Sequence, residues 1–69
     1  MSNKDRLKRL NKSIDELKEA KDTLLYGARL SLNSGEYSHA KWNCEKLVTL
    51  QEEIAEFEET VKELEESGE

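Results

Sequence analysis

Proline is absent from this 69-residue chain, and only Gly27, Gly35 and Gly68 give the backbone extra freedom, so few points force a helix to end. No apolar run approaches the 18 or more residues of a membrane-spanning helix. The one cysteine, Cys44, cannot form a disulfide within the chain, and no apolar segment of the secretory kind stands near the N-terminus. We therefore expect a single domain, residues 1–69, in the reducing cytoplasm and not in a membrane.

Charge is unevenly distributed along the chain. Residues 1–33 carry eight basic against five acidic side chains, whereas residues 34–69 carry three against eleven. A basic half and an acidic half suit two helices that lie side by side. They do not favour direct nucleic-acid binding, because the acidic half is a covalently tethered competitor for the basic one.

Apolar side chains recur every three or four residues in both halves, which predicts two long helices with heptad seams. The first seam contains Leu7, Leu10, Ile14, Leu17, Leu24 and Ala28. The second contains Ala40, Leu47, Leu50, Ile54, Phe57, Val61 and Leu64. Between them Asn33-Ser34-Gly35 is a strong turn signal, in which Gly35 can end one helix and Ser34 or Asn33 can cap the next. We expect helices over about residues 3–33 and 36–66, a turn at 33–36 and a frayed tail at 67–69.

The two seams fit each other if the helices run antiparallel. Pairing Leu24 with Leu47 and Leu17 with Ile54 centres the turn between Gly35 and Glu36, so periodicity and turn chemistry agree. The same alignment places Lys21 and Asn43 at seam positions, where polar residues commonly fix the register of paired helices. The expected fold is an all-α, coiled-coil-like antiparallel two-helix hairpin.

A hairpin of this size buries one seam only, and self-association is a usual remedy for such a small core. Beside the seam, one flank of the predicted hairpin carries further apolar side chains near the turn. They are Leu25, Leu32, Tyr37, Cys44 and Val48. We interpret them as an oligomer interface that joins hairpins into a four-helix bundle or a larger homo-oligomer.

The opposite flank combines aromatic, cationic and small residues. Its members are Tyr26, Gly27, Arg29, Leu30, His39, Trp42 and Lys46. Trp, Tyr and Arg are enriched at protein contacts, which favours a surface for another protein or for further copies of this chain. The same side chains would also suit a phosphorylated or nucleotide-like small molecule held in a pocket between subunits.

Two acidic patterns raise the possibility of catalysis. Glu36-x-x-His39 has the spacing of di-iron helical bundles, but the first half supplies no acid at the same level. Glu52-Glu53-x-x-Glu56 is similar to the motif of MazG-type nucleotide pyrophosphohydrolases, whose carboxylates hold Mg²⁺, although nothing after Glu56 supplies that family's Glu-x-x-Asp. We interpret Glu36 as complementing the dipole at the start of the second helix and the second pattern as solvated helix surface, and we expect no catalytic residue, metal or cofactor.

These observations predict a non-catalytic, homo-oligomeric interaction protein, a small acidic regulator or inhibitor that binds another macromolecule through its helical surface. The alternative is a small-molecule sponge that sequesters a phosphorylated ligand at subunit interfaces. The third and least favoured function is that of a MazG-like Mg²⁺-dependent nucleotide hydrolase.

Overall fold

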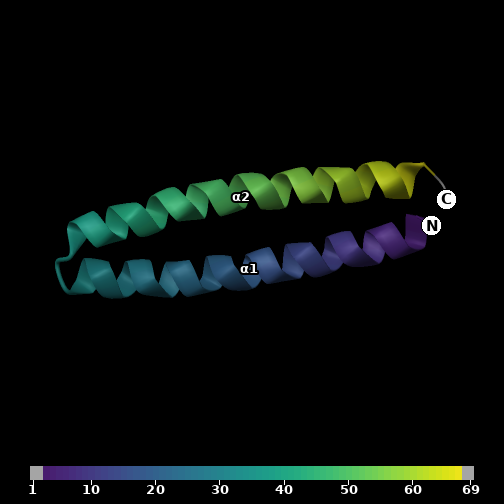
Figure 1. The fold of residues 1–69 in the computed structure, drawn as a ribbon. Coiled ribbons are helices and arrows are strands. Elements are labelled where there is room, and N and C mark those ends of the chain that lie inside the picture. The colour runs from purple at the N-terminus through teal and green to yellow at the C-terminus, as the bar shows by residue number, and fades with distance from the viewer. Residues whose placement is uncertain (1–2, 68–69) are drawn as a thin grey trace.

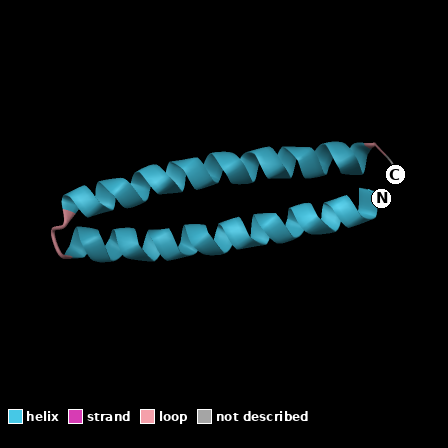
Figure 2. Cartoon of the chain, in the orientation of Figure 1, coloured by secondary structure: helices cyan, strands magenta, loops and turns pink. Residues whose placement is uncertain are grey.

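The computed structural model describes residues 3–67 as two helices that lie side by side along their whole length (Figure 1). Helix α1 spans Asn3–Asn33 and helix α2 spans Tyr37–Glu66. The molecule is a rod of 51 × 14 × 13 Å, and only a short loop separates its helices (Figure 2). The prediction of an all-helical hairpin is confirmed. Within residues 3–67, neither helix combines the length and the apolarity that a membrane crossing requires.

The turn is built by backbone hydrogen bonds around one left-handed residue. Gly35 has φ 79°, a conformation that glycine adopts without a steric cost. The amide of Glu36 donates to the Ser31 carbonyl at 2.8 Å, and the Ser34 hydroxyl donates back to the Leu30 carbonyl at 2.9 Å. The expectation that Ser34 or Asn33 caps the second helix is therefore wrong. Ser34 instead satisfies the end of α1, and the cap position of α2 belongs to Glu36, which makes no side-chain capping bond among the described residues.

The open end, opposite the turn, has a conventional apolar core. Ile14 is 5% exposed and Ile54 is 7% exposed, so both are buried between the helices. The neighbouring seam side chains are half-buried, at Leu7, Leu10, Leu17, Phe57, Val61 and Leu64. At the tip, Asn3 Nδ2 donates to the Ser67 hydroxyl at 3.2 Å, which holds the ends of the two helices together.

The seam near the turn is filled by small and polar side chains. Its buried residues are Ala28, Ser31, Ala40 and Asn43. A Cβ placed on Gly27 would lie 3.4 Å from Asn43 Nδ2, so the Asn43 side chain packs against α1 at the level of Gly27. This close approach gives Gly27 a packing role in the middle of α1, where glycine otherwise costs about 1 kcal/mol relative to alanine.

Asn43 is 3% exposed, and its Nδ2 has no hydrogen-bond partner within residues 3–67. A buried donor left without a partner costs about 1–3 kcal/mol. Asn43→Leu, which keeps the number of side-chain heavy atoms, is therefore expected to raise the free energy of unfolding by about 1 kcal/mol in chemical denaturation. Asn43→Ala removes the same amide but leaves its volume empty, so it should gain less. A loss of stability in Asn43→Leu would show that the amide is bonded in solution.

Candidate functional site

Large apolar side chains are exposed in one half of the molecule. Within the described residues, those of this kind are Leu25, Tyr26, Leu30, Leu32, Tyr37, Trp42 and Val48. All of them lie between residues 25 and 48, on the two helices next to the turn. The fully buried seam residues in this half are small or polar and Leu24 and Leu47 are only half-buried, so most of its large hydrophobic groups lie outside. Exposed apolar patches of this kind usually mark sites of association.

We call Leu25, Leu32, Tyr37, Cys44 and Val48 the Leu25 flank. Leu25 and Leu32 are seven residues apart on α1, as are Tyr37 and Cys44 on α2, so each pair shares a helix face. Val48 lies one turn beyond Cys44 on the same side of α2. All members of the Leu25 flank are exposed in the single chain. The predicted oligomer interface is thus accessible to a partner.

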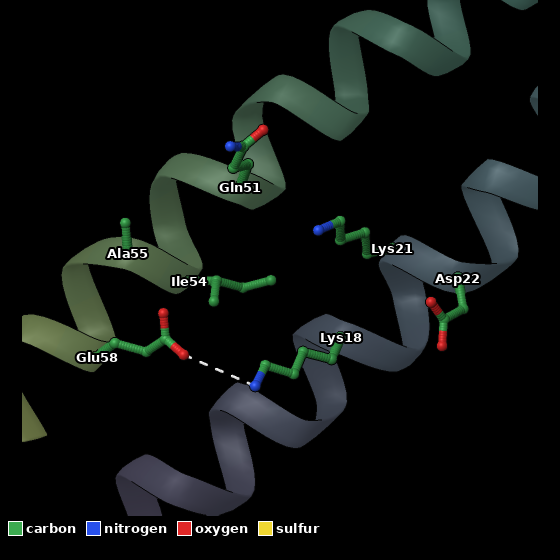
Figure 3. A pocket seen from close by; sticks show the side chains of 7 residues that line it. All are labelled: Lys18, Lys21, Asp22, Gln51, Ile54, Ala55 and Glu58. Carbon is green, nitrogen blue, oxygen red and sulfur yellow. Dashed lines mark ion pairs between the residues drawn. The ribbon is translucent and has the colours of Figure 1, made fainter.

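A groove of about 470 Å³ continues the Leu25 flank toward the open end, and sequence reasoning did not identify it (Figure 3). Its lining residues are Lys18, Lys21, Asp22, Gln51, Ile54, Ala55 and Glu58. Lys18 precedes Leu25 by seven residues, and Gln51 follows Cys44 by seven, which places the groove and the Leu25 flank on one face. These seven-residue spacings are the sequence signal from which the groove could have been predicted.

The charges of the groove are balanced. Lys18 Nζ lies 3.7 Å from Glu58 Oε2, and both side chains are about half exposed. Such an exposed pair contributes about 0–1 kcal/mol, so it aligns the two helices more than it stabilises them. Lys21 and Ile54 point into the space between the helices, and Asp22 lies beyond Lys21 on α1 (Figure 3). With two cations and two carboxylates, the groove has no net preference for an anion or a cation.

The opposite flank contains an aromatic and cationic cluster on α2. The His39 and Trp42 rings have centroids 6.0 Å apart at an interplanar angle of 30°. Lys46 Nζ lies 5.7 Å from the centre of the Trp42 ring, within the range of a cation–π interaction. His39, Trp42 and Ser38 line a shallow hollow. We call His39, Trp42 and Lys46 the Trp42 cluster.

The interactions in the structure do not link the other residues of this predicted surface to the Trp42 cluster. Among the hydrogen bonds, ion pairs and ring contacts of residues 3–67, none joins Tyr26 or Arg29 to Trp42. Arg29 lies four residues after Leu25 and three before Leu32, which places it on the face of the Leu25 flank. Gly27 is half-buried beneath Asn43, and Leu30 is exposed on α1.

The candidate catalytic patterns remain on the surface. Glu36 and His39 are exposed next to the turn, as are Glu52, Glu53 and Glu56 along α2. In the part of the chain that the structure describes, no group of three or more histidine, cysteine or acidic side chains is arranged to hold a metal ion. Cys44 is a free, exposed thiol within the Leu25 flank.

The fold and its surfaces define a class: an all-helical antiparallel hairpin with an exposed apolar flank next to its turn and an aromatic–cationic cluster on the other side. No protein-family model, no curated protein and no solved structure matches this chain.

Proposed function

We propose that this protein is a non-catalytic interaction protein that self-associates and binds another macromolecule as a small acidic regulator or inhibitor. The observation that carries this proposal is the exposure of large apolar side chains in the half next to the turn, where the fully buried residues are small or polar. The net charge of −5 describes the acidic character, and the lone cysteine favours a cytoplasmic location.

Self-association follows from the energetics of a small core. A single core in fewer than 70–80 residues rarely supplies more than about 3–5 kcal/mol. Fully burying a Leu or Val side chain contributes about 1.5–3 kcal/mol. Leu25, Leu32 and Val48 are exposed in the single chain, so covering them with a second copy adds stability where the seam is weakest. A four-helix bundle or a larger homo-oligomer is the resulting assembly.

A second macromolecule would then bind on the side that self-association leaves free. The Trp42 cluster lies across the hairpin from the Leu25 flank, because Trp42 and Lys46 are each two residues from Cys44, which is about 200° around the α2 helix. Tryptophan is the side chain most often found as an energetic anchor at protein contacts. We therefore assign the binding of another protein to Trp42.

The alternative is a sponge for a phosphorylated small molecule. It is supported by the position of Lys46 Nζ, 5.7 Å from the Trp42 ring centre, with His39 on the neighbouring turn. A base could stack on the indole while the ammonium group and the imidazole contact a phosphate.

Native mass spectrometry of the protein purified from its source cell separates these functions. We expect a homo-oligomer together with a co-purifying protein, and Trp42→Ala should release that protein without changing the number of copies. The alternative predicts a retained small molecule and a nucleotide-dependent rise in Tm that Lys46→Ala removes. A monomer with neither a protein nor a small molecule attached would contradict both proposals.

A further inference from the structure

We infer that two copies of this chain associate in a parallel two-fold arrangement, turn beside turn, with α1 of each hairpin against α2 of the other. The contact face is the Leu25 flank together with the groove that continues it. This inference rests on the proposed self-association and adds its orientation. The proposed parallel dimer differs from a bundle in which two hairpins lie head to tail.

The position of the apolar residues requires the two turns to lie together. On the contact face, Leu25 and Val48 lie near the turn, whereas the same face carries Lys4 and Lys8 at the open end of α1 and Glu65 at the open end of α2. A head-to-tail pair would press the Leu25 flank against these charged side chains, which burial would leave desolvated. In the parallel pair, Leu25 lies level with Cys44 and Val48 of the partner subunit, and apolar surface covers apolar surface.

The charges at the open ends of the contact face also suit the parallel arrangement. The α1 edge of this face carries Lys4, Lys8 and Lys18 together with Asp22, and the α2 edge carries Glu58 and Glu65 together with Lys62. Setting α1 of one copy against α2 of the other brings Lys4 and Lys8 near Glu65 of the partner subunit, so opposite charges meet at the open ends. Glu53, Glu56 and Glu63 lie on the opposite side of α2, away from this contact.

The available area selects the full-length pair over a partial overlap. The chain exposes 5482 Å², about 1,000 Å² more than the roughly 4,500 Å² expected of a compact monomer of 8.0 kDa. Each partner contributes roughly 800 Å² to a standard interface. A rod 51 Å long and 14 Å wide offers the most contact area when two copies overlap along their whole length, whereas a contact confined to the two turns uses only part of that length.

Distances between spin labels test the orientation in the full chain. In a Cys44→Ser background, one label is placed at Ser38→Cys near the turn and, in a separate variant, at Glu66→Cys near the open end; both sites are exposed. We expect both distances between copies to be about 30 Å or less, because a four-helix bundle is about two helix diameters wide. Sedimentation of the unlabelled Cys44→Ser protein shows that the background change preserves the dimer.

The outcomes distinguish the proposed parallel arrangement from the proposed self-association. A dimer with both distances near the 51 Å length of the rod would be head to tail and would overturn the parallel arrangement while leaving self-association standing. A short distance at Ser38 with a far longer one at Glu66 would show that only the turns overlap, and would also overturn it. A monomer in sedimentation of the unsubstituted protein would refute self-association itself.

Discussion

Leu32→Lys is expected to weaken self-association at least 100-fold. The change removes an apolar side chain from the Leu25 flank and introduces a charge that association would desolvate. Losing the burial of a leucine costs about 1.5–3 kcal/mol, and the ammonium group adds to this, so a total above about 3 kcal/mol corresponds to the stated factor. A two-fold contact contains the substitution twice, which makes the expected factor a lower bound. Sedimentation equilibrium over a range of concentrations measures it.

Leu30→Lys is the matched control. Leu30 and Leu32 are both 51% exposed on α1 and the substitution is the same, so helix propensity and monomer burial change alike. The two positions are about 200° apart around the helix, so Leu30 lies away from the Leu25 flank. We expect Leu30→Lys to leave the association constant unchanged. If both variants dissociate equally, the contact is not confined to the Leu25 flank, and if neither does, the flank is not the interface.

The hairpin was predictable because periodicity and turn chemistry constrain the same feature. Seam residues at spacings of three and four define one face on each helix, and Gly35 with φ 79° supplies the reversal that the Asn33-Ser34-Gly35 signal indicated. Ile14 and Ile54, both assigned to the seam from the sequence, are buried in the structure.

The contacts between side chains were less predictable, because they depend on rotamers that a spacing does not fix. The ion pair between Lys18 and Glu58, for example, was not predicted from the antiparallel alignment. The unpartnered amide of Asn43 likewise depends on how closely α1 approaches at Gly27.

The candidate site divides in the same way. His39, Trp42 and Lys46 are three and four residues apart, so their contact follows from helix geometry alone and could be read from the sequence. Contacts between residues on different helices could not be predicted in this way. Arg29 was grouped with Trp42, but its position between Leu25 and Leu32 places it on the opposite flank.

Ile54→Ala is expected to unfold most of the single hairpin at low micromolar concentration. Ile54 is 7% exposed at the centre of the seam, and truncating a buried isoleucine to alanine costs about 2–5 kcal/mol. That loss is comparable to the roughly 3–5 kcal/mol that a core of this size supplies. Circular dichroism during urea titration measures the loss, and the better helix propensity of alanine acts against it.

Val48→Ala provides the contrast that connects folding to association. Val48 is 55% exposed in the single chain and lies on the Leu25 flank, so its truncation should cost little in the monomer. If a second copy covers it, Val48→Ala should lower Tm mainly at high protein concentration, where the assembly contributes to stability by mass action. Ile54→Ala should lower Tm at every concentration, with partial recovery as the protein is concentrated. If Val48→Ala and Ile54→Ala lowered Tm with the same dependence on protein concentration, the Leu25 flank would stay exposed and the hairpin would be stable alone.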